Sequence, residues 1–233
     1  MTLEEVPQVD SQRKSKPFMQ VILERRATPH FTDEPVSDED LNEILGLAAQ
    51  APSGFNLQPW RFIVVRDPEN RKRLQKVAMN QQKIAEAPVV VIALGMKEEF
   101  KRRAEEIFLQ GARRGVGRVE QAAASVKRAL DFIATLPADV WVNRHTMIAF
   151  TVMMLAAEAL GYDTAPMEGF DPAGVKREFG IPDEAEVVAL LAIGRARLPD
   201  KPYGGRLDLN RIIFAESFGR QWEGGPPAAG IES

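Results

Sequence analysis

The sequence of 233 residues contains no cysteine and only two histidines. The lack of cysteine excludes disulfides, thiolate nucleophiles and cysteine-ligated metal sites, and nothing indicates an oxidising compartment, so we expect a cytoplasmic protein. His30 and His145 lie far apart in the sequence and have no evident companion ligands. We therefore interpret both as surface or packing residues and expect no metal site.

Long apolar runs and a strong net charge are also absent. The longest apolar stretch, residues 147–157, is much shorter than the roughly 20 residues that span a bilayer, and the polar N-terminus lacks the apolar region of a signal peptide. The formal net charge is only -3, so no global positive field attracts nucleic acid or an anionic membrane. We expect neither as a partner.

The motifs of several enzyme classes are missing. GVGRVE at 115–120 has the first two glycines of a dinucleotide-binding turn but follows no strand, and no P-loop, nucleophile elbow or zinc-protease motif occurs. A protein without such groups can still catalyse demanding chemistry if a cofactor supplies it. Attention therefore turns to loops that could bind a ligand.

The apolar content of 45% is sufficient for a core, and the patterning predicts one domain of interspersed helices and strands at 17–219, between a flexible arm (1–16) and a disordered tail (220–233). A charged helical excursion is expected at 97–138. Proline, glycine and capping residues set the expected element boundaries. Helices are expected at 18–26, from Ser37 to Ala51, 67–79, 139–160 and 171–180, and extended segments at 62–65, 88–94, 164–168 and 187–193.

The segment APSGFNLQPW, residues 51–60, joins an expected helix to an expected strand. Pro52 ends the helix, and Ser53-Gly54 permits a sharp turn. The neutral amides of Asn56 and Gln58 each offer a donor and an acceptor suited to the edge of a polar heterocycle. The segment is a constrained ligand loop or, equally, a helix-to-strand connector stabilised by its own amides.

The sequence resembles the nitroreductase family in several separated motifs. These are ERRATPHFTDEPVSDEDLNEIL, APSGFNLQPWRFIVV, GYDTAPMEGFD, the REFGIP turn and VVALLAIG. The resemblance covers about residues 18–95 and 139–216. It implies an α+β fold, a mixed central sheet wrapped by helices, in an intertwined homodimer with two FMN sites at the interface.

The resemblance places Arg25 and Arg26 near the FMN phosphate and ribityl chain, where a guanidinium can form paired charge-assisted hydrogen bonds. A simple helix-end charge is the alternative. The family often has serine and a further arginine where this chain has Ala27 and Pro29, which removes one expected side-chain contact.

The resemblance also assigns the loop residues. Pro52, Ser53 and Asn56 match the loop that reaches the flavin of the other subunit, and Gln58 lies beside it. The homodimer would then be required for cofactor binding.

Glu168-Gly169 resembles the element whose backbone amides face flavin N5 and O4. Glycine permits close approach, and a fixed N–H donor at N5 favours the reduced cofactor. A turn before the next helix is the alternative. Arg206 matches a basic residue near the phosphate, or is a solvated tail charge. The apolar segment 211–216 has no evident partner within the chain, and we expect it to pair with the sheet of the second subunit.

The implied function is an FMN-dependent oxidoreductase. NADH or NADPH binds first and reduces the flavin, and an electron-poor acceptor such as a nitroaromatic or a quinone then occupies the same pocket, in a ping-pong cycle. No catalytic side chain is expected, because the flavin carries the hydride. Phe108 or Trp141 could line the pocket, although both also suit core packing. The alternatives are a specialised reductase of the same fold, such as a dehalogenase or an enoyl-type enzyme, a non-catalytic FMN-binding regulatory dimer, and a cofactor-free interaction module.

Overall fold

A computed structural model describes residues 15–198 and 201–223. The chain divides into two compact units, residues 1–200 and 201–233, which are described separately below. Most of the expected N-terminal arm and the tail from Gly224 onward lie outside the described residues. The domain expected at 17–219 contains residues of both units.

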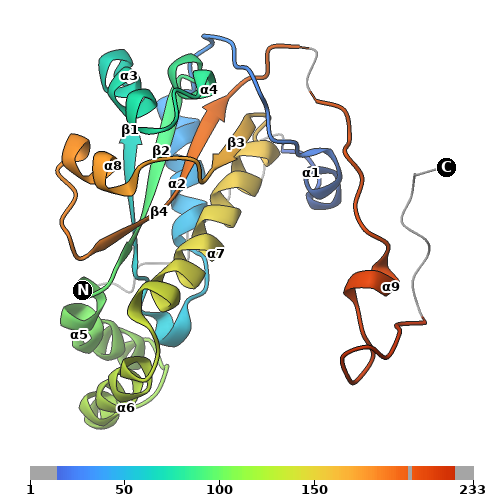
Figure 1. The fold of residues 1–233 in the computed structure, drawn as a ribbon. Coiled ribbons are helices and arrows are strands. Elements are labelled where there is room, and N and C mark those ends of the chain that lie inside the picture. Colours follow the sequence, from blue (N-terminus) through green and yellow to red (C-terminus); the bar gives the residue numbers. More distant parts are fainter. Residues whose placement is uncertain (1–14, 199–200, 224–233) are drawn as a thin grey trace. The chain divides into compact units, whose positions relative to one another are not determined.

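The first unit is built on a four-stranded sheet (Figure 1). Its strands are β1 (Trp60–Val65), β2 (Val89–Met96), β3 (Asp163–Met167) and β4 (Ala185–Gly194), in the order β1-β2-β4-β3. β2 and β4 occupy the centre, and all residues of β2 are buried, as expected for an apolar strand covered on both faces.

The expected α+β class is confirmed, but the named strands pair antiparallel rather than in mixed directions. Helices α3 (Pro68–Val77) and α4 (Gln82–Glu86) connect β1 to β2 and pack on each other. The chain therefore enters β2 where β1 ended, with Val65 opposite Val90. Alternating strand and helix patterns could not distinguish this connection from a crossover.

Helices cover both faces of the sheet (Figure 1). On one face α3, α4 and α8 (Pro172–Phe179) bury a cluster that includes Leu74, Ile84 and Val175. On the other face α2 (Asp38–Ala49) and α7 (Ala138–Ala159) contribute Ile44, Phe150 and Met153. Successive residues of β2 alternate between the two clusters, because side chains of a strand point to opposite faces.

The charged segment 97–138 contains two amphipathic helices, α5 (Glu99–Arg113) and α6 (Ala122–Ala134). With the start of α7 they form a third apolar cluster around Trp141, Phe100 and Leu57.

The predicted helix boundaries have the expected physical causes. Ser37 Oγ accepts a hydrogen bond from the backbone N–H of Asp40, and Asp67 and Asp171 cap α3 and α8 in the same way. Gly180 ends α8 with a φ of 63°, a left-handed conformation that favours glycine.

Helix α1 (Phe18–Glu24) is two residues shorter than expected. The segment that follows pairs with the edge strand β3: Ala27 forms an isolated parallel bridge with Thr164, and the N–H of Thr28 donates to Thr164 O at 3.0 Å. Because an extended segment supplies this pairing, the helix ends at Glu24 and Arg25 already has a ψ of 128°.

In the second unit, part of the segment expected to be extended is helical. Arg211 belongs to α9 (Leu209–Ile212), and the N–H of Ile213 donates to Leu209 O at 2.8 Å. The chain then turns back, with a bridge between Phe214 and Gln221. The N–H of Ala215 also donates to Arg220 O at 2.9 Å. Pairing of 211–216 with a second subunit stays a prediction.

Candidate cofactor site

The two arginines and the Glu168-Gly169 element lie along the same edge of the sheet. The arginines precede the segment that pairs with Thr164 at the start of β3, and Glu168 follows its last residue. Thr164 and Glu168 are four residue steps apart along the strand, a distance of about 13 Å. The outer edge of β3, on the side away from β4, thus carries a basic segment near one end and a glycine turn at the other.

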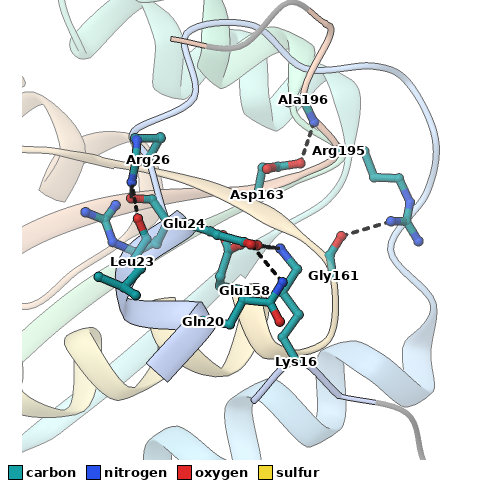
Figure 2. Close-up of polar contacts among 11 residues, drawn as sticks. Lys16, Gln20, Leu23, Glu24, Arg26, Glu158, Gly161, Asp163, Arg195 and Ala196 are labelled. Atoms are coloured by element: carbon teal, nitrogen blue, oxygen red, sulfur yellow. Dashed lines mark hydrogen bonds and ion pairs between the residues drawn. The ribbon is translucent and has the colours of Figure 1, made fainter. Parts of the chain in front are cut away.

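Arg26 interacts with the end of α1 (Figure 2). Its Nη1 donates to Leu23 O at 2.7 Å and to Arg25 O at 2.9 Å. These are carbonyls of a helix C-terminus, where a cation is favourable. Arg26 therefore bonds the end of its own helix in this structure, and an anion would have to compete with these carbonyls for Nη1. Its role toward the FMN phosphate stays a prediction.

A buried ion pair attaches α1 to α7 (Figure 2). Lys16 Nζ lies 2.6 Å from Oε1 of Glu158, whose side chain is 5% exposed, and 3.3 Å from Glu24 Oε2. Partial burial by itself lowers the pKa of Lys16, but the hydrogen bonds and charges of Glu158 and Glu24 outweigh it, so the pKa is raised. The pair places the start of α1, and so the arginines after it, relative to the core.

The glycine turn after β3 contacts a loop that sequence reasoning missed. This loop, residues 78–81, joins α3 to α4, and Gln81 Nε2 donates to Gly169 O at 2.8 Å. A Cβ on Gly169 would lie 3.2 Å from Met79 Sδ, so glycine allows this close approach. Glu168 itself is exposed. The sequence held one signal for this loop, Asn80, because asparagine tolerates the left-handed conformation that Asn80 adopts.

The 51–60 loop is anchored at its apolar positions and exposes its amides. Leu57 is 1% exposed and Trp60 6%, whereas Asn56 is exposed. Ser53 Oγ accepts from the N–H of Gln58 at 2.9 Å, and Gln58 Nε2 donates to Asn56 O at 3.0 Å. The loop is therefore constrained, as expected, partly by its own amides.

The backbone of this loop adopts an uncommon conformation. Phe55, Asn56 and Gln58 have φ values of 55°, 57° and 46°, in the left-handed region that non-glycine residues rarely adopt. Such residues are held by their surroundings and cluster at functional sites.

His145 packs beneath the loop. Its Nδ1 lies 2.8 Å from Trp141 O and its ring stacks on the Trp141 indole with centroids 4.4 Å apart. A Cβ on Gly54 would lie 3.0 Å from His145 Nε2. His145 therefore has the packing role expected of it, and His30 lies at the surface 3.2 Å from Glu86 Oε2.

The structure separates the predicted site residues into groups. One group lies along β3 and comprises Arg25, Arg26, Glu168 and Gly169. The 51–60 loop lies elsewhere, because its Gly54 is beside His145. His145 precedes Glu158, which anchors the segment before α1, by thirteen residues of α7. Thirteen helical residues span about 20 Å. Between these places, Pro52 lines an apolar groove formed by α1, α2 and α7.

Arg206 lies in the second unit. Its Nη1 donates to Gly205 O at 2.7 Å, and its guanidinium lies over the Tyr203 ring at 5.6 Å from the centroid.

The two aromatic residues considered for the pocket take part in packing. Trp141 is 4% exposed and lies 4.7 Å from Phe100, centroid to centroid, and Phe108 packs on the same cluster. The exposed aromatic pair is instead Phe55 of the loop and Phe132 of α6, in edge contact at 6.0 Å.

Among residues 15–198 and 201–223, no cluster of histidine and acidic side chains could hold a metal. In the same residues, no helix combines the length and apolar character of a membrane span.

The fold is that of an α+β protein with helices on both faces of an antiparallel sheet. A family model described as the nitroreductase family matches residues 22–195. The chain belongs to the nitroreductase family.

Relatives and solved structures agree with this assignment. A Thermus thermophilus protein named NADH dehydrogenase is 34% identical over 195 residues, covering 82% of this chain and 92% of that protein. MhqN of Bacillus subtilis, named as a candidate NAD(P)H nitroreductase, is 30% identical over 202 residues, covering 84% of this chain and 97% of that protein. A structure from Exiguobacterium sibiricum, described as a candidate nitroreductase in complex with FMN, has a TM-score of 0.79 at 27% identity and covers 88% of this chain and 99% of that one.

Proposed function

We propose that this chain is an FMN-dependent oxidoreductase that uses NADH or NADPH to reduce electron-poor acceptors such as nitroaromatics and quinones, and that it works as a cytoplasmic homodimer. The observation that carries the proposal is the match to the nitroreductase family over residues 22–195, together with the basic segment and the glycine turn along β3. Relatives named for NAD(P)H-dependent activity and a structural neighbour named as an FMN complex support it.

The groups along β3 suit FMN chemically. Arginine can supply charge-assisted hydrogen bonds to a phosphate, and the turn at Gly169 is narrow enough that a Cβ would meet Met79 Sδ at 3.2 Å. The N–H of Gly169 has no acceptor among the described residues. A flavin edge needs such a close, fixed donor. Bound FMN would supply the hydride chemistry.

The residues of this chain would then bind and orient the reactants rather than exchange protons with them. Arg25 and Arg26 would neutralise the phosphate, and Gly169 would donate to the redox edge. Asn56 and Gln58 would provide amides from the loop, and Arg206 would add a positive charge. Fixed orientation of donor, cofactor and acceptor is the protein's contribution to the rate.

An exposed apolar surface supports the homodimer. Four of the exposed residues of α1 are apolar: Phe18, Met19, Ile22 and Leu23, at 67%, 70%, 48% and 69%. Phe18 also lines a groove of about 660 Å³ that includes Val152 and Leu155 of α7. A continuous apolar surface of this kind marks an association site. A second copy related by two-fold symmetry would bring its 51–60 loop to the β3 edge, which the loop does not reach within one chain.

The spectrum of the purified protein, followed by anaerobic addition of NADH or NADPH, tests the proposal. We expect bound yellow flavin, bleaching by a nicotinamide and recovery of colour on addition of a nitroaromatic or a quinone. Protein that is colourless and does not bind added FMN would contradict the proposal. Flavin that neither nicotinamide bleaches would favour a regulatory FMN-binding dimer, and recovery with a single acceptor from a panel with halogenated phenols and enones would favour a specialised reductase.

A further inference from the structure

Gln81 connects the loop between α3 and α4 to the glycine turn after β3. Its Nε2 donates to Gly169 O at 2.8 Å and to Ala78 O at 3.3 Å. The side chain is half-buried. One amide group thus bonds a carbonyl of its own loop and a carbonyl that lies 88 residues further along the chain.

The backbone of the loop fixes the place of this amide. Met79 and Asn80 have φ values of 54° and 52°, and local hydrogen bonds hold them there: Asn80 N donates to Gln75 O at 3.0 Å and Gln81 N to Ala78 O at 3.2 Å. Two successive left-handed residues are retained only where the surroundings determine the conformation. The donor of Gln81 therefore comes from a rigid turn.

The glycine turn is held on both sides of one free donor. The N–H of Asp171 donates to Val77 O at 2.8 Å and that of Phe170 to Glu168 O at 3.1 Å. Gly169 O accepts from Gln81, whereas Gly169 N–H has no acceptor in the part of the chain that the structure describes. Because glycine can rotate readily about φ and ψ, the direction of this N–H depends on the bonds to its neighbours.

We propose that Gln81 is a positioning residue for the cofactor: by holding Gly169 O, it aims the free Gly169 N–H at the redox edge of FMN. The inference rests on the proposed function. A hydrogen bond weakens steeply when its donor is misaligned, and a pre-aligned donor stabilises negative charge that develops on the group it faces. Loss of the Gln81 contact should therefore make reduced FMN less stable relative to oxidised FMN.

The test compares Gln81→Met with Gln82→Met. Methionine has nearly the length of glutamine but cannot donate, and Gln82 is an exposed neighbour of the same type. The reduction potential of bound FMN is measured by equilibration with a reference dye, together with the dissociation constant of FMN and the melting temperature of the apoprotein. We expect Gln81→Met to shift the equilibrium about tenfold toward oxidised FMN, which is about 30 mV for two electrons, and Gln82→Met to leave it unchanged.

A shorter variant separates position from polarity. Gln81→Asn keeps the amide but withdraws it by one methylene, and we expect it to shift the potential in the same direction. A Gln81→Met potential equal to that of the wild type would overturn the inference, even if the variant melted earlier or bound FMN more weakly, because that result would leave Gln81 a purely structural role. Wild-type protein that does not bind FMN would instead refute the proposed function, and this inference with it.

Discussion

Lys16 and Glu158 form an ion pair with an Nζ to Oε1 distance of 2.6 Å, although 142 residues separate them in the sequence. The backbone N–H of Lys16 also donates to Ala159 O at 2.9 Å, so the segment before α1 is bound twice to the end of α7. Among the residues that the structure describes, Glu158 is the only charged residue that is buried, with 4% of its surface exposed. Its carboxylate depends on Lys16 for a counter-charge.

Lys16→Met should destabilise the protein by about 2 kcal/mol. Removal of Lys16 leaves the buried charge of Glu158 without compensation. The expected loss is smaller than for a fully buried pair because the Lys16 side chain is 34% exposed, so water screens its charge. Urea unfolding measures the loss. Glu158→Gln, which removes the buried charge itself, should cost less, and equal losses in the two variants would contradict this account.

At alkaline pH the free energy of unfolding of the wild type should fall more steeply than that of Lys16→Met. The folded-state pKa of Lys16 is raised above the ordinary 10.5, so its contribution is fully present below that value and is lost as the pH rises through the folded-state pKa. Unfolding free energies of both proteins, compared from neutral pH into this alkaline range, isolate the effect because their other groups titrate alike. A constant difference across the range would show that the ion pair does not contribute.

Gly54→Ala should be destabilising through His145. The added Cβ would lie 3.0 Å from His145 Nε2 and 3.4 Å from Trp141 Cζ2, a close contact that costs about 1 kcal/mol. In the background of His145→Ala the same substitution should have little effect. A double-mutant cycle by thermal and urea unfolding measures the coupling, and additive losses would show that His145 does not support the loop.

Gly95→Ala should destabilise the contact between β2 and α7. Its Cβ would lie 2.7 Å from Val142 Cγ2, and overpacking of this kind costs about 1 to 3 kcal/mol. Val142→Ala removes the methyl group at 2.7 Å but keeps its own Cβ, which would lie 2.9 Å from the new Cβ. The double variant should therefore recover part of the strain and be more stable than the sum of the single losses predicts. If the second substitution adds its own full loss, the strain lies elsewhere.

Leu23→Glu should weaken both dimerisation and FMN binding, because it places a charge on the exposed apolar face of α1. Val116→Glu is the matched control, since Val116 is similarly exposed, at 75% against 69% for Leu23, but lies in the turn between α5 and α6. Sedimentation velocity and FMN titration should show a change for Leu23→Glu alone. A dimer that persists with unchanged FMN affinity would place the interface on another surface.

Much of the local structure could be predicted from the sequence. The caps at Ser37, Asp67 and Asp171 start helices where expected, and the apolar runs at 88–94 and 187–193 are the two central strands. The constrained loop at 51–60 also agrees with its prediction. These features depend on neighbours within a few residues, whose hydrogen bonds and periodicity are visible in the sequence.

Long-range pairing decided the remainder. The early end of α1 follows from a bridge between Ala27 and Thr164, and the role we infer for Gln81 follows from its contact with Gly169. The sequence by itself determined which residues form helices, strands and turns, together with the resemblance of several motifs to one family. Only the tertiary structure decided strand direction and the grouping of residues along β3, because both depend on contacts between segments that folding brings together and whose order no local pattern encodes.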